Sequence, residues 1–195
     1  MSGLNNKFFF KEISKQIEFV FFAFEDIQAE LNEKGSNSKR FWYSVQSLLI
    51  SAANISKILY PSPKSRRTNR ERAVLLRENL KLEEDSVLAD KKIRNCFEHF
   101  DEHLDDFISN YEKSNGVYFD NNISDLSSLR DTGKNFYLRN YNPRTNTVTF
   151  KNISYEIQPV IDELIKLKQK LEELDTVSRI KNRLKVMEKY EKLNI

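Results

Sequence analysis

Apolar side chains recur at three- and four-residue steps over most of this chain, and this periodicity limits the fold more than any other feature. Near the N-terminus it predicts a helix from about Asn5 to Leu31. The apolar stripe of this helix is Phe10, Ile13, Ile17, Phe21, Phe24 and Leu31. The 195 residues include only 4 Gly and 4 Pro, so long uninterrupted elements are favoured over a turn-rich β fold.

Three more helices are predicted in the first two thirds of the chain. The second ends at the Pro-Ser-Pro turn of residues 61–63, and its inward stripe is Trp42, Val45, Leu49, Ala52, Ile55 and Leu59. A short third helix is expected to begin at Thr68, because Thr68 and Glu71 have the spacing of a capping box. The fourth helix has a stripe of Ile93, Phe97, Phe100, Leu104, Phe107 and Tyr111.

The last third of the chain mixes a β-hairpin with a long helix. Residues 117–152 predict a loop and a β-hairpin insertion, because "FYLRNY" and "TVTFKN" alternate in polarity around the turn residues "NPRTN". From "ISYEIQPV" onward we expect a long helix with heptad-like spacing of Ile157, Val160, Leu164, Leu167, Leu171 and Leu174. Residues 178–195 extend this helix as a basic segment. We therefore predict one all-α domain over residues 1–195, an up-and-down bundle of four to five helices with a small β-hairpin before the last long helix.

Composition limits the compartment and the membrane class. The chain has one cysteine, which excludes an internal disulfide framework and favours a cytoplasmic protein. Charged residues such as Lys11, Glu12 and Lys15 interrupt the phenylalanine-rich N-terminal segment too often for a membrane span or a signal peptide. The formal net charge of +3 is too small to indicate nucleic-acid binding by itself.

Positive charge is densest around the third helix. Arginines stand at Arg66, Arg67, Arg70, Arg72 and Arg77. One interpretation is a solvated helix face with intrahelical ion pairs. The other is a surface that attracts phosphate groups, and therefore a nucleic-acid-binding surface.

The stretch "RNCFEHFDEHLDDF", residues 94–107, holds both histidines of the chain and its cysteine. At about 100° per residue, Asn95, His99 and His103 lie on one line along the helix, with His103 nearer the apolar stripe. Arg94 lies on the other flank of the polar side. These side chains are therefore expected in solvent or in an interface, and not in the core.

Three interpretations of this stretch compete. In the first, Arg94 pairs with Glu98 across one turn and the histidines are simply exposed. In the second, His99 and His103 clamp a metal ion, but zinc needs three or four protein ligands and the chain has no third histidine. No metal and no cofactor is therefore expected.

The third interpretation is acid–base cleavage of RNA. Histidine can take a proton from a ribose 2′-hydroxyl near neutral pH, and an arginine can hold the scissile phosphate. Asn95 can orient either partner. One helix supplies one arginine and one histidine, so two copies across a dimer axis would build a fuller site.

This stretch resembles the signature of HEPN (higher eukaryotes and prokaryotes nucleotide-binding) domains, which is an arginine, a polar residue, a short gap and a histidine. Here the matching residues are Arg94, Asn95 and, after three further residues, His99. The resemblance covers residues 5–115 and the last long helix, and the hairpin near 136–151 does not match the common family pattern. It implies a helical bundle and a metal-independent endoribonuclease that acts as a homodimer. Arg94 and His99 would then be the catalytic pair and Asn95 the polar auxiliary, while His103 has no family role.

The resemblance also implies RNA as a partner and a toxin or defence role, with an antitoxin or regulatory protein as a further partner. Some family members keep the fold without nuclease activity. The alternative is therefore a non-catalytic helical module that binds protein or RNA, with the long last helix and the polar face around His99 as its binding surfaces.

Overall fold

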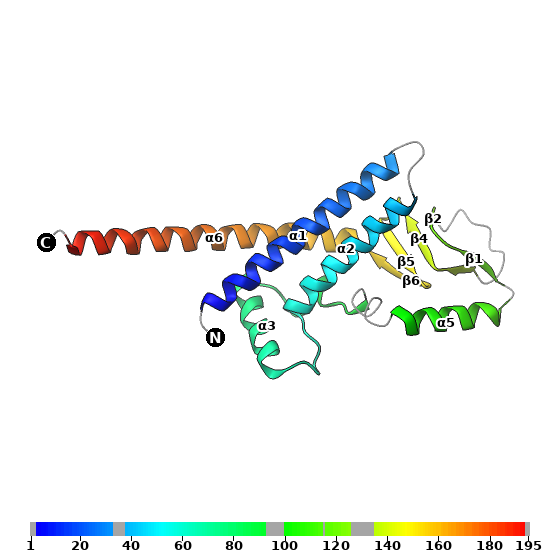
Figure 1. The fold of residues 1–195 in the computed structure, drawn as a ribbon, viewed down its shortest axis with the longest axis horizontal. Helices are drawn as coiled ribbons and strands as arrows, with labels where there is room; N and C mark the ends of the chain where they lie inside the picture. The colour runs from blue at the N-terminus through cyan, green and yellow to red at the C-terminus, as the bar shows by residue number, and fades with distance from the viewer. Residues whose placement is uncertain (1–2, 33–37, 93–99, 115, 126–134, 194–195) are drawn as a thin grey trace.

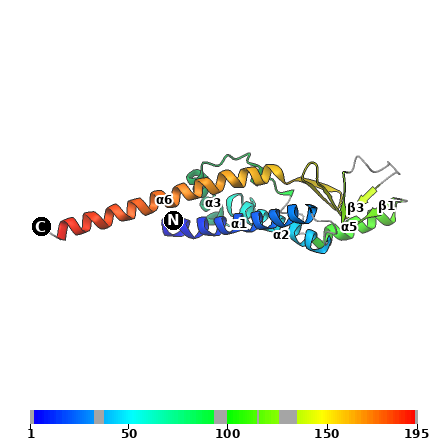
Figure 2. The same ribbon diagram turned by 90° about the horizontal axis from the view of Figure 1, so that it is seen from above.

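Long helices form both ends of the structure, as predicted. The computed structural model describes residues 3–32, 38–92, 100–114, 116–125 and 135–193. Within these, α1 spans Gly3–Asn32, α2 spans Ser38–Leu59 and α6 spans Gln158–Leu193. Figures 1 and 2 show α1 and α2 side by side in one layer, with the first half of α6 packed on one face of that layer. Its second half runs on past the rest of the protein.

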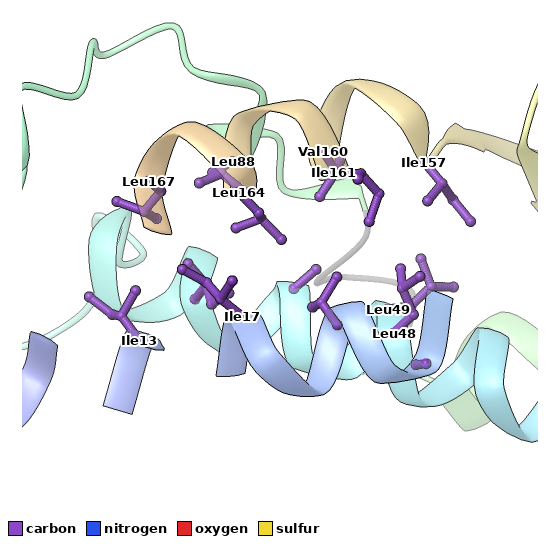
Figure 3. Packing of buried hydrophobic residues seen from close by; sticks show 14 of the residues in the cluster. Ile13, Ile17, Leu48, Leu49, Leu88, Ile157, Val160, Ile161, Leu164 and Leu167 are labelled. Carbon is purple, nitrogen blue, oxygen red and sulfur yellow. The ribbon is translucent and has the colours of Figure 1, made fainter. Parts of the chain in front are cut away.

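The main core lies between the α1–α2 layer and α6. Figure 3 shows Ile13 and Ile17 of α1 and Leu48 of α2 pointing toward Leu164 and Leu167 of α6, and all five are buried. Burying one such side chain contributes about 1.5–3 kcal/mol. All six residues predicted to point inward from α2 are buried. The predicted stripe of the last helix is also buried from Ile157, just before α6, to Leu171.

The predicted stripe of α1 is confirmed only in its centre. Ile13 and Ile17 are fully buried, whereas the predicted phenylalanines Phe10, Phe21 and Phe24 only pack at the edge of the core. The positions that complete the buried face are Val20, Ala23 and Ile27. The helical period was therefore identified correctly. The predicted stripe was rotated away from the core face, because the large aromatic residues were assumed to be the buried ones.

The third helix, α3, spans Arg67–Leu80 and is followed by the short 3-10 helix η1 at Val87–Ala89. The expected capping box is wrong. The N-cap is Arg66, which makes no side-chain capping bond, and Thr68 lies inside the first turn. Glu71 instead accepts a hydrogen bond from Arg67 Nε at 2.7 Å.

The β-hairpin insertion is confirmed and is larger than predicted. A four-stranded sheet contains β2 (Asn122–Ile123), β4 (Arg139–Asn142), β5 (Thr147–Phe150) and β6 (Ile153–Glu156) in that order. The expected hairpin is β4–β5, with Asn142 opposite Thr147. A separate parallel pair joins β1 (Val117–Phe119) to β3 (Asn135–Tyr137).

The start of the last helix was predicted too early. Ile153–Glu156 forms strand β6, and α6 begins only at Gln158. Pro159 explains the correction, because proline is tolerated in the first turn of a helix but breaks an interior. A helix that started at Ile153 would have placed Pro159 in its second turn.

The helix that follows the arginine–histidine stretch packs on the β region. It is α5, Phe100–Glu112, and the rings of Phe107 and Tyr111 each lie 5.7–5.9 Å from the ring of Phe136. Figure 1 shows α5 beside the strands, away from α3. Phe107 is buried as predicted, while Ile93 and Phe97 lie outside the described residues. The described fold is thus mostly helical with a small β region between α5 and α6.

Candidate functional site

The predicted catalytic residues Arg94, Asn95 and His99 lie outside the described residues. The structure describes the chain again from Phe100, where α5 begins. His103 is in the first turn of this helix, four residues after His99, and is partly buried. The described part of the candidate site therefore starts at His103.

His103 lines a groove of about 370 Å³ between α5 and the β region. One wall is α5, with His103, Asp106 and Asn110 at a spacing that keeps them on one face of the helix. The opposite wall is the turn after β5, which contributes Lys151 and Asn152. Phe107, Phe136 and Ile153 complete the lining.

The turn that carries Lys151 is a two-residue hairpin between β5 and β6. Phe150 pairs with Ile153, and the two turn residues Lys151 and Asn152 have φ values of 50° and 62°. This left-handed pair suits the twist of a β-hairpin and usually contains glycine. Lys151 has no such preference and this conformation costs it roughly 1–2 kcal/mol, whereas asparagine adopts it more readily. Other contacts must therefore hold the turn in place.

Hydrogen bonds to the β3–β4 segment hold it. Asn152 Oδ1 accepts from Tyr137 N–H at 2.8 Å, and Asn152 N–H donates to Tyr137 O at 3.0 Å. Lys151 N–H donates to Leu138 O at 3.0 Å. The Lys151 ammonium lies 4.8 Å from the ring centre of Phe150, and the residue is only 7% exposed. The cation is therefore fixed at the groove by the backbone and by its aromatic neighbour.

An imidazole, an ammonium, a carboxylate and two amides thus line one groove. Ammonium and amide groups bind oxyanions such as phosphate, and an imidazole can transfer a proton. Sequence reasoning considered His103 only as half of a metal clamp and gave it no role in RNA cleavage. It missed Lys151, because only the tertiary fold brings residue 151 to α5. The non-glycine hairpin turn "KN" between two short alternating segments was the one local signal.

The predicted basic surface divides into two groups. Arg66, Arg67 and Arg70 are exposed. Arg67 pairs with Glu71, and Arg70 Nη1 donates to Pro63 O at 3.0 Å and also to Ser65 O. These three side chains lie on the surface, and their role in attracting phosphate groups stays a prediction.

Arg72 and Arg77 turn inward and bind the end of α2. Arg77 Nη1 donates to Leu59 O at 2.6 Å, and Arg72 Nη2 donates to Ile58 O at 3.4 Å. Carbonyls in the last turn of a helix lack partners within the helix and carry its negative dipole end, so the two guanidinium groups cap α2. Burial lowers the pKa of Arg72 below its ordinary value.

Aromatic rings cover both of these guanidinium groups. Arg72 lies 4.3 Å from the ring centre of Phe9, and Arg77 lies 5.0 Å from that of Tyr60. Arg77 is also ion-paired with Glu84 at 2.7 Å. These contacts join α3 to α1 and α2, which makes Arg72 and Arg77 packing residues in this fold.

The groove and the arginines do not form one site. Figures 1 and 2 place α3 and α5 at different ends of the α1–α2 layer. The basic extension of α6 exposes Arg179, Lys181 and Arg183, and Arg179 pairs with Asp175 at 2.7 Å.

Among the described residues, no cluster of three or more His, Cys, Asp or Glu side chains could hold a metal ion. The suggested His99–His103 clamp includes a residue outside them. No helix within the described ranges has the length and apolar character needed to cross a membrane. Comparison with models of protein families, with curated proteins and with solved structures finds no match to this chain.

Proposed function

We propose that this chain is a HEPN-like, metal-independent endoribonuclease that acts as a homodimer. Arg94 would bind the scissile phosphate and His99 would transfer protons. Asn95 would orient the arginine or the histidine. The observation that carries the proposal is the groove beside α5. In the sequence, His103 follows Asn95 and His99 at the same four-residue step, and it lines this groove with Lys151 on the opposite wall.

The reaction needs two proton transfers and no metal. One histidine takes the proton of a ribose 2′-hydroxyl, and the 2′-oxygen attacks the neighbouring phosphorus. The bond from phosphorus to the 5′-oxygen breaks, and that oxygen receives a proton from an imidazolium. The products are a 2′,3′-cyclic phosphate and a 5′-hydroxyl, and the arginine offsets the charge that develops on the phosphoryl oxygens.

The groove gives this proposal a place for a second phosphate of the same strand. Lys151 supplies a fixed cation, while Asn110 and Asn152 line the walls. The exposed arginines Arg66 and Arg67 would add long-range attraction to RNA. In this proposal α1, α2 and α6 would correspond to part of the family's helical bundle, while α5 packs on the β region.

Cleavage of a structured RNA by the recombinant protein in the presence of a chelator tests the proposal. Arg94→Ala and His99→Ala should abolish cleavage while the circular dichroism spectrum stays unchanged. Arg179→Ala is the matched control, because it removes an exposed arginine on the projecting part of α6, and it should retain cleavage. Equal cleavage by wild type and His99→Ala would disprove the catalytic assignment.

A non-catalytic binding module is the second candidate. The observation that favours it is the exposed apolar side chains Val177, Ile180 and Leu184 on the part of α6 that projects beyond the fold, each about half exposed. Stable RNA binding without product formation, unchanged in His99→Ala, would support this function over the nuclease.

A further inference from the structure

A small pocket lies between α2 and the strands β4 and β5. Its volume is about 80 Å³, and most of its lining consists of buried apolar side chains. These are Trp42, Val45 and Leu49 from α2, with Val148 and Phe150 from β5. Figure 1 shows β4 and β5 beside α2. An apolar lining with a few polar groups is typical of sites that bind small molecules.

Two polar residues complete the lining of this pocket. Gln46 is exposed on α2, and the Arg139 side chain of β4 is 30% exposed, so both belong to its open edge. Arg139 Nη1 donates to Asp120 Oδ1 at 2.7 Å. The charge of this guanidinium is therefore balanced, while the group has further N–H groups to donate. A neutral ligand with carbonyl oxygens suits this edge better than a carboxylate, which would meet the charge of Asp120.

The indole of Trp42 also favours a ligand that brings an acceptor. Trp42 is only 8% exposed, and its Nε1–H is buried without an acceptor among the residues that the structure describes. Buried polar groups are almost always paired in native proteins. The amide of Gln46 can both donate and accept. The pocket therefore fits a planar ring whose edge carries carbonyl oxygens as well as N–H groups.

This pocket is next to the groove beside α5. Phe150 lines the pocket, and the following residue, Lys151, lines the groove. The Lys151 ammonium lies 4.8 Å from the ring centre of Phe150. A ligand ring that contacts Phe150 would therefore have a cation close enough to bind a phosphate attached to it. A neutral ring with an attached phosphate is the chemistry of a nucleotide.

We propose that this pocket binds one pyrimidine base of the RNA strand, whose phosphate occupies the groove beside α5. The base packs against Trp42 and Phe150. Its edge accepts hydrogen bonds from Arg139 and exchanges them with Gln46. Proteins bind unpaired bases in this way, with aromatic side chains on the ring and polar side chains on its edge.

The size of the pocket selects a pyrimidine. A cavity of about 150 Å³ holds a benzene ring, so the 80 Å³ here admits the edge of one ring but not the two fused rings of a purine. This inference rests on the proposed function for its RNA substrate. Binding of the base itself requires neither Arg94 nor His99.

Fluorescence of Trp42 tests the inference directly, because the chain has a single tryptophan. Uridine and cytidine monophosphate should each produce a saturable change, and adenosine and guanosine monophosphate should bind about tenfold more weakly or worse. Ribose 5-phosphate has no base and should produce no change. No saturable change with the pyrimidine nucleotides, or equal affinity for the purine nucleotides, would overturn the inference.

Variants of the polar edge test the assigned contacts. Arg139→Leu should weaken binding of uridine monophosphate about tenfold or more, because it removes a charged donor. Arg144→Leu is the matched control, since Arg144 also pairs with an aspartate of the β region, Asp125 at 2.9 Å, and it should bind like wild type. Gln46→Ala changes an exposed residue and should also weaken binding, so the test does not depend on the folding of Arg139→Leu. Equal affinities of Gln46→Ala and the control would overturn the assignment.

Mononucleotides contain no phosphodiester bond, so their binding is measured independently of nuclease activity. Uridine monophosphate should bind more tightly than uridine, because Lys151 lies beside the bound ring, and equal affinities would overturn the placement of the phosphate. Binding of uridine monophosphate by a protein that cleaves no RNA would refute only the proposed nuclease. Cleavage of RNA by a protein that binds no mononucleotide would refute only the pyrimidine pocket.

Discussion

Arg77 offers a sharp test of the division between packing arginines and surface arginines. In Arg77→Met the aliphatic part of the side chain is kept, and the guanidinium group is lost. The Leu59 carbonyl then loses the hydrogen bond of 2.6 Å that Arg77 Nη1 donates to it. Arg77 is only 9% exposed, so water does not readily replace this donor. A hydrogen bond to a charged group contributes about 1.5–3 kcal/mol.

The other contacts of Arg77 add less. Removing a cation from the end of a helix costs about 0.3–1 kcal/mol, and the stacking on Tyr60 contributes roughly 0.5–1 kcal/mol. The partner carboxylate of Glu84 is 82% exposed, so the ion pair itself contributes little. Because these terms overlap, we expect a total loss of about 3 kcal/mol, which corresponds to a fall in Tm of roughly 6–12 °C for a chain of this size.

Urea and thermal unfolding of Arg77→Met, monitored by circular dichroism, provide the measurement. The control is Arg67→Met, which removes an exposed arginine and its surface ion pair with Glu71, and should cost less than about 0.5 kcal/mol. If the two variants lose equal stability, Arg77 does not cap α2 in the way described. Below its unfolding temperature, Arg77→Met should bind RNA like wild type.

Two more predictions concern buried hydrogen bonds. Burial raises the pKa of Tyr141 to about 12, whereas an unfolded tyrosine has a pKa near 10. The neutral phenol therefore stabilises the fold fully below pH 10. This contribution to stability is lost as the pH rises toward 12. Wild type should lose about 2–3 kcal/mol more than Tyr141→Phe over this range, as measured by urea unfolding at several pH values; parallel pH profiles would contradict this. Asn152→Ala removes the acceptor for Tyr137 N–H and should cost about 1–3 kcal/mol, whereas Asn152→Asp keeps an acceptor and should cost less; equal losses in thermal unfolding would show that the turn does not depend on this bond.

The helical period could be predicted from the sequence because it depends on local spacing. All six positions predicted to point inward from α2 are buried, but Phe41 and Leu48, which the predicted stripe omits, are buried as well. In α1 the same method gave a stripe shifted toward Phe10 and Phe21, because this helix carries apolar residues on two faces. Only packing against α6 decides which face is internal.

The errors at β6 and α3 arose although the sequence contained the correct indications, because other features of the sequence were given more weight. Pro159 indicated that α6 begins near Gln158, yet the apolar periodicity around it was treated as continuous helix. Arg77 lies four residues after the buried Ala73 and three before the buried Leu80, so its helical phase indicated an inward position. Its charge led to a surface assignment instead. The groove beside α5 could not be predicted, because Lys151 and His103 come to line the same groove only through the packing of the β region.

The projecting half of α6 affects how the size of this protein can be measured. A helix of 36 residues is about 54 Å long, while a globular chain of this length has a radius of gyration of only about 16 Å. Figures 1 and 2 show the helix extending beyond the N-terminal end of α1. The friction of this rod makes a single chain migrate on a sizing column like a heavier globular protein. Elution volume alone would therefore overestimate the mass of a single chain.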